Sequence, residues 1–144
     1  MAYLTQKITS AKSPRLCLAN DLGRPIDGAW WPYSAVLADE LSGLVTALDY
    51  RLGKVQRLSV NWSSRHNPPN LNWQDWRTKP QHIMTIDGSE ARATLLIVPN
   101  STNSTLASMV LRRAGGFEVD VQRGQEAMLA NAEAILASAR RQRK

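Results

Sequence analysis

The amino-acid sequence predicts an α+β domain, in which a single sheet of four or five mostly antiparallel strands carries helices on one face, with an appended C-terminal helix. Three observations lead to this fold class. Apolar residues recur at intervals of three and four between residues 34 and 52, as in an amphipathic helix. The run 95–98 is apolar on both faces, as in a central strand. Asp87-Gly88 separates two β-like segments and is a strong hairpin signal.

The N-terminal elements lead from a strand through a tryptophan motif into a long helix. Residues 15–20 are expected to form a short strand, which is followed by turn residues. Residues 27–32 then form the motif Asp-Gly-Ala-Trp-Trp-Pro. The helix is expected to begin at about Ser34, a suitable N-cap, and to end before Gly53.

The middle of the chain predicts short strands that are interrupted by prolines. Residues 55–62 form the first of them, and two consecutive prolines then break both helix and sheet. A short strand is expected over residues 70–76. The segments 82–86 and 91–98 are better candidates, because they flank the hairpin signal.

Two further helices complete the pattern. One is expected to begin at Asn100 or Ser101, both good caps, and to end at Gly115-Gly116. The other spans residues 125–141 and has a thin, alanine-rich apolar stripe. That stripe suits packing on the domain, pairing with a partner helix, or loose attachment.

The chain divides into three parts along its 144 residues, a length typical of one domain. Residues 1–13 are expected to be a flexible arm, residues 14–116 the α+β domain, and residues 117–144 a connector with a basic C-terminal helix. Within the domain, the first strand, the long helix and the next strand are expected to form a right-handed parallel crossover.

The formal charge of +6 is concentrated at the ends of the chain. Lys7 and Lys12 lie near the start, and residues 13–139 are neutral, so the body offers no broad surface for a phosphate backbone. Cations at the C-terminus can attract RNA, or they can stabilise a helix by interacting with the negative end of its dipole. These cations are Arg140, Arg141, Arg143 and Lys144.

The sequence contains no catalytic or metal-binding motif. A single cysteine, Cys17, excludes a disulfide framework, and its apolar neighbours indicate a small buried residue. His66 and His82 form no ligand pattern with nearby carboxylates. We therefore expect no metal and no cofactor, and we favour a non-catalytic protein. No stretch resembles a signal peptide or a membrane span, which predicts a cytoplasmic location.

Residues 62–79 are the best candidate for a binding site, because tryptophans alternate there with cations. Such a mixture stacks nucleobases, anchors a protein interface, or closes the core of a small sheet. We expect a protein or ribonucleoprotein partner to bind this Trp-rich loop and the basic C-terminal helix. The candidate partner-binding residues are Trp62, Arg65, Trp73, Trp76 and Arg77, with the four C-terminal cations.

An alternative function places a small molecule beside the tryptophan motif. Asp27 with Trp30 and Trp31 would then line the pocket of a ligand binder or an enzyme, in which the rings exclude water from the carboxyl group. An aspartate that precedes a glycine more often closes a turn by accepting hydrogen bonds from its own backbone. Both interpretations remain open at this point.

The motif also carries a family resemblance. Gly-Ala-Trp-Trp-Pro at residues 28–32, together with Leu-Leu-Ile-Val-Pro at residues 95–99, resembles a family of small actinobacterial proteins known only as a domain of unknown function. The resemblance covers about residues 14–115 and leaves the last helix as an addition. It implies a common fold unit and a bacterial cytoplasmic location, and it implies no activity.

Overall fold

The computed structural model describes residues 13–63 and 68–142, and it confirms the α+β class. Five strands form one mixed sheet in the order β1-β2-β5-β4-β3. The β2–β5 pair is parallel, and the other three neighbouring pairs are antiparallel. The strands are β1 (Leu16–Leu18), β2 (Gly28–Trp30), β3 (Val55–Val60), β4 (Ile83–Gly88) and β5 (Arg92–Ile97).

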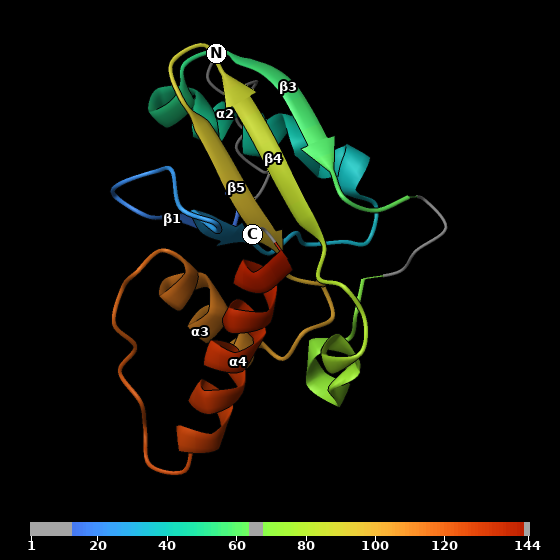
Figure 1. Ribbon diagram of the computed structural model, residues 1–144, viewed down its shortest axis with the longest axis vertical. Helices are drawn as coiled ribbons and strands as arrows, with labels where there is room; N and C mark the ends of the chain where they lie inside the picture. Colours follow the sequence, from blue (N-terminus) through green and yellow to red (C-terminus); the bar gives the residue numbers. More distant parts are fainter. Residues whose placement is uncertain (1–12, 64–67, 143–144) are drawn as a thin grey trace, which may run out of the picture.

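In the described part of the chain, three α-helices and three short 3₁₀ helices pack around this sheet (Figure 1). The α-helices are α2 (Leu41–Leu52), α3 (Ser104–Ala114) and α4 (Glu126–Gln142). The 3₁₀ helices are η1 (Leu37–Glu40), η2 (Leu71–Trp73) and η3 (Asp75–Arg77). Figure 1 shows α3 and α4 side by side, with the yellow-green segment of η2 and η3 next to α4.

Helices cover both faces of the sheet, whereas the sequence predicted helices on one face. Leu95 and Ile97 of β5 pack with the buried leucines of α2, whereas Leu96 and the following Val98 pack with α3 and α4. A strand that is apolar on both sides needs cover on both sides, because burying apolar surface is the main gain in folding. The run 95–98 therefore already indicated the two-sided architecture.

The predicted parallel crossover is wrong, because β1 and β3 lie at opposite edges of the sheet. The parallel partner of β5 is β2, a strand of three residues inside the tryptophan motif. Gly28 begins β2, and a Cβ atom there would lie 2.1 Å from the carbonyl oxygen of Cys17 in β1. Only glycine therefore permits this close approach of β1 to β2.

The rest of the motif alternates between the two faces of the sheet. Ala29 and Trp31 are buried against the cluster that contains α3 and α4, and Trp30 is buried in the cluster that contains α2. The two adjacent tryptophans therefore join both halves of the core. The guanidinium of Arg15 packs over the end of the motif, 3.5 Å from the ring centroid of Trp31 and 3.9 Å from that of Tyr33.

Helix α2 begins later than expected. Ser34 does not cap it, because its hydroxyl donates to the carboxylate of Glu40 at 2.7 Å. The same carboxylate accepts the backbone N–H groups of Tyr33 and Ser34, at 2.6 Å each. Glu40 thus holds residues 33–34 outside the helix. Helix α3 is capped by the Asn103 side chain, three residues beyond the first predicted cap.

Two predictions in the middle of the chain also need correction. Residues 70–76 form 3₁₀ turns instead of a strand. The hairpin turns two residues later than predicted, because Gly88 is the last residue of β4 and its N–H donates to the Ala91 carbonyl (2.9 Å). A Cβ at Gly88 would lie 2.2 Å from the Leu52 carbonyl oxygen. Gly88 is therefore required for the close contact with α2, and it does not form the turn.

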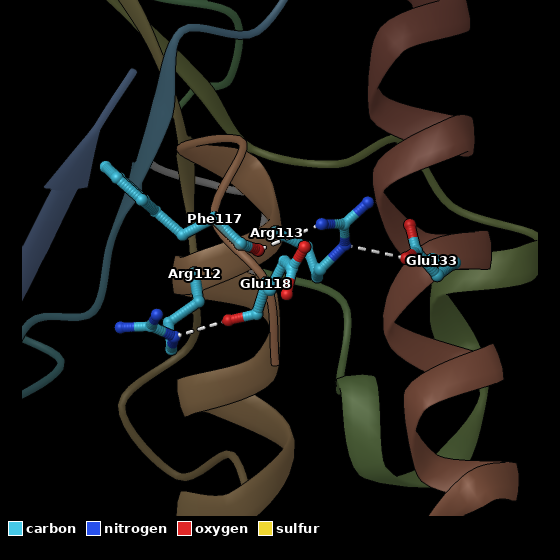
Figure 2. A network of polar contacts seen from close by, with 5 residues as sticks. All are labelled: Arg112, Arg113, Phe117, Glu118 and Glu133. Atoms are coloured by element: carbon cyan, nitrogen blue, oxygen red, sulfur yellow. Dashed lines mark hydrogen bonds and ion pairs between the residues drawn. The ribbon is translucent and has the colours of Figure 1, made fainter. Parts of the chain in front are cut away.

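Helix α4 packs on the domain, which decides between the three alternatives that its sequence left open. Its buried residues Ala132, Ile135, Leu136 and Ala139 belong to the core cluster of α3. In Figure 2 the Arg113 side chain extends from α3 to Glu133 of α4, and it also donates to the Phe117 carbonyl. The connector and α4 are thus fastened to the end of α3.

Candidate functional site

A groove lies between the 3₁₀ segment 71–77, the start of α3 and the outer side of α4. Its volume is about 930 Å³, and we call it the Trp73 groove. The side chains that matter most for its chemistry are Trp73, Arg77, Leu106, Met128 and Asn131. The sequence separates the 3₁₀ segment from α4 by some fifty residues, yet the fold places them on two sides of one groove.

Trp73 presents its ring to solvent from a well-anchored backbone. Its side chain is 76% exposed, whereas that of Trp76, three residues later, is 4% exposed and part of the core. Asn72 fixes the segment to the start of α3: its side chain donates to the Ser101 carbonyl (3.1 Å) and accepts the Asn103 N–H (2.9 Å). The backbone that carries the exposed ring is therefore anchored to the start of α3.

The far end of the segment is held by two glutamines. The buried Gln81 side chain donates to the Trp76 carbonyl at 3.1 Å. Gln142, at the end of α4, accepts the Gln81 N–H at 2.6 Å and donates to the Gln81 carbonyl at 3.1 Å. These bonds join the end of the Trp-rich loop to the end of α4.

Gln74 adds an unusual backbone conformation beside Trp73. Its φ of 69° lies in the left-handed region, and no other non-glycine residue that the structure describes has a positive φ. Non-glycine residues in this region are strained by about 1–3 kcal/mol and cluster at functional sites. The strained residue follows the exposed tryptophan directly, so the turn that displays Trp73 is a candidate functional feature.

The electrostatics of the Trp73 groove are set by one cation. Among the described residues that line the groove, Arg77 alone has an ionisable side chain. Its guanidinium donates to the Gln74 side chain (2.6 Å) and lies 5.1 Å from the Trp76 ring centroid. The amide oxygen of Asn131 is buried and has no hydrogen-bond partner among the residues described.

The predicted partner-binding residues are thus divided among several environments. The Trp73 groove brings together Trp73 and Arg77, and Trp76 is a core residue. Trp62 lies elsewhere, stacked on His82 with ring centroids 4.5 Å apart. Of the C-terminal cations, Arg140 is half-buried and Arg141 exposed at the end of α4. Arg65, Arg143 and Lys144 lie outside the described residues, as does most of the arm 1–13.

Sequence reasoning missed the contribution of α4 to the groove. Met128 and Asn131 are one helical turn apart and both line it, together with the small residues Ala127, Ala130 and Ala134. A signal was present, because an asparagine within an alanine-rich helix favours neither the helix nor a dry core. The sequence could not show which distant segment this side of α4 faces.

The residues of the alternative small-molecule pocket lie in the interior and do not line the Trp73 groove. These residues are Asp27, Trp30 and Trp31. Asp27 is 2% exposed, and its carboxylate accepts the backbone N–H groups of Gly23, Arg24 and Thr94 at 2.8–2.9 Å. Asp27 therefore closes the turn before β2 and ties it to β5. Trp30 and Trp31 are both buried, as described above.

The single cysteine is half-buried, whereas the sequence predicted a buried residue. Burial raises the pKa of the half-buried Cys17 thiol, and the nearby Arg112 opposes this effect more weakly. The thiol is therefore neutral at physiological pH and is a poor nucleophile. Within the described ranges 13–63 and 68–142, no three histidine, cysteine or acidic side chains gather as metal ligands would, and no helix is long and apolar enough to cross a membrane.

Comparison with known proteins agrees with the family resemblance. A family model, described as a family of unknown function (DUF5994), matches residues 15–114, close to the expected extent of about 14–115. No curated protein and no solved structure matches the chain. The matched segment holds all five strands, α2 and α3, whereas α4 lies beyond it. The chain therefore belongs to DUF5994, a family of unknown function.

Proposed function

We propose that this protein is a non-catalytic binding protein that docks a partner protein in the Trp73 groove. The single observation that carries the proposal is the exposed ring of Trp73 on a hydrogen-bonded, strained turn. Large aromatic side chains cost free energy when they face water, and tryptophan and arginine dominate the energetics of protein interfaces. In this proposal Trp73 is the anchor and Arg77 selects the partner.

The chemistry of the groove indicates a segment with an apolar side chain and an acidic group. Leu106 and Met128 supply apolar surface, and the flexible thioether of Met128 adapts to different side chains. Arg77 complements a carboxylate of the partner segment. The proposal includes a cytoplasmic location, as the family resemblance implies, and assigns the terminal cations a supporting electrostatic role.

Replacing Trp73 with alanine is expected to abolish capture of the partner from a lysate of the source cells. A loss of at least tenfold in affinity is typical for an anchor, which contributes about 2 kcal/mol or more. Trp73→Ala should leave the melting temperature almost unchanged, because the side chain is exposed. Trp76 stays intact in this experiment, since removing a buried tryptophan costs about 3–5 kcal/mol and would disturb the fold.

Tyr50→Ala is the matched control, because Tyr50 is a comparably exposed aromatic side chain (85%) on α2. The control should capture the partner normally, whereas Arg77→Gln should weaken capture of an acidic partner. Undiminished capture by Trp73→Ala contradicts the proposal, and so does an equal loss in Tyr50→Ala. Capture that disappears after nuclease treatment would show that RNA, and not a protein, holds the complex.

A further inference from the structure

The strands β2 and β5 form a topological switch point. They are parallel neighbours, so their carboxyl ends, at Trp30 and Ile97, lie at the same edge of the sheet. After β2 the chain leads to α2 on one face, and after β5 it leads to α3 on the other face. In open sheets such a divergence leaves a crevice beyond the strand ends, and ligands bind there.

A second cleft occupies this position. Its volume is about 330 Å³, and Pro32 and Ser34, which follow β2, face Pro99 and Asn100, which follow β5. We call it the switch-point cleft. A further part of its lining comes from the stacked rings of Trp62 and His82, whose planes are within 5° of parallel. His82 is 6% exposed, so this ring pair is a fixed part of the cleft.

The lining of the switch-point cleft favours an uncharged, flat ligand. Apart from His82, none of its described lining residues is ionisable, and most of them are apolar or aromatic: Pro32, Ala35, Leu37, Trp62, Pro68, Ile97 and Pro99. A charged ligand would lose its hydration without gaining a counter-charge. Aromatic ligands pack well against an existing pair of rings. Such a cleft also falls at the small end of the size range of ligand pockets.

Ser34 is one of three polar lining residues, with His82 and Asn100, and its hydrogen bond to Glu40 defines what it can offer a ligand. Its hydroxyl proton is used in the 2.7 Å bond to Glu40, so the Ser34 oxygen has free capacity only as an acceptor. An N–H or O–H group on the ligand would use this capacity. Glu40 also fixes the backbone around Ser34, which holds the acceptor in a constant position.

We propose that the switch-point cleft binds a small, uncharged aromatic molecule that carries one N–H or O–H donor, of the size and kind of an indole. This site is separate from the Trp73 groove and does not depend on the docking proposal. It also differs from the pocket predicted beside Asp27, because Asp27, Trp30 and Trp31 do not line it and, of the motif residues, Pro32 alone does.

Titration with indole, followed by ¹⁵N NMR, tests the proposal. Indole is expected to shift the Trp62 indole N–H and Asn100 signals in a saturable way. Indole-3-acetate and tryptamine, which have the same ring with a negative or a positive charge, should bind at least about tenfold more weakly. 1-Methylindole, which lacks the donor, should bind about five- to tenfold more weakly than indole.

Two variants locate the binding. Ala35→Trp fills the switch-point cleft from an exposed loop position, so it should abolish the indole-induced shifts without unfolding the protein. Trp73→Ala should leave them unchanged, which keeps this test independent of the Trp73 groove. The proposal is overturned if indole does not saturate these signals, if the charged or methylated probes bind as tightly as indole, or if Ala35→Trp binds indole normally.

Discussion

A chain truncated after Gly116 is expected to lose its cooperative unfolding transition, although it retains the whole segment that matches the family. The truncation removes α4, whose Ile135 and Leu136 are completely buried against α3. Burying one such side chain stabilises a protein by about 1.5–3 kcal/mol, so with the two buried alanines the loss is about 5 kcal/mol. This loss is comparable to the entire stability of many domains.

Thermal unfolding followed by circular dichroism measures this effect. Glu126→Ala in the full chain is the control, because Glu126 is exposed in the first turn of α4, and it should shift the melting temperature by no more than a few degrees. If the truncated chain unfolds cooperatively at the melting temperature of the full chain, α4 contributes nothing to the core and our description of the helix is wrong.

Asp27→Ala is expected to lower the free energy of unfolding by about 3–6 kcal/mol. The substitution leaves the Thr94 N–H, whose bond to Asp27 is buried, without its acceptor, at a cost of about 1–3 kcal/mol. It also removes the hydrogen bonds from the N–H groups of the exposed residues Gly23 and Arg24 to a charged acceptor, each worth about 1–1.5 kcal/mol. The effect is large because Asp27 joins the turn before β2 to the central strand β5.

Urea denaturation of the purified variants measures this change in the free energy of unfolding. Asp21→Ala provides a matched comparison, since Asp21 is an exposed aspartate of the same turn region, and its loss should change the free energy by less than about 0.5 kcal/mol. A small effect of Asp27→Ala, similar to that of Asp21→Ala, would contradict the structural role and would reopen the view of Asp27 as a residue kept for chemistry.

Much of the fold could be predicted from local patterns. The last helix was expected over 125–141 and is found at Glu126–Gln142, because alanine-rich helical periodicity is a strong local signal. Strand β2 was missed, since three residues that are buried on both faces show no alternation. The start of α2 was misplaced because Glu40 accepts hydrogen bonds from residues six and seven positions earlier, which helical periodicity does not reveal. The hairpin turn was misplaced because Gly88 packs against Leu52, a residue far away in the sequence.

The candidate site could be predicted only in part. The mixture of aromatic and basic residues drew attention to the segment that includes Trp73 and Arg77, and these two residues line the Trp73 groove. It could not distinguish Trp73 from Trp76, because exposure depends on how the 3₁₀ turns orient each ring. The groove itself needs α4, and the pairing of two segments so far apart in the sequence is a property of the tertiary fold.

Site-specific photo-crosslinking shows whether a partner protein contacts the Trp73 groove. A photoreactive phenylalanine in place of Ala130, an exposed residue on the wall of the Trp73 groove, is compared in cells with the same group in place of Ala47, an exposed residue of α2. Our account expects one dominant adduct from position 130, mapped to a partner segment with acidic and apolar residues, and none from position 47. Equal adducts from both positions, or a partner crosslinked from position 47 alone, would contradict it.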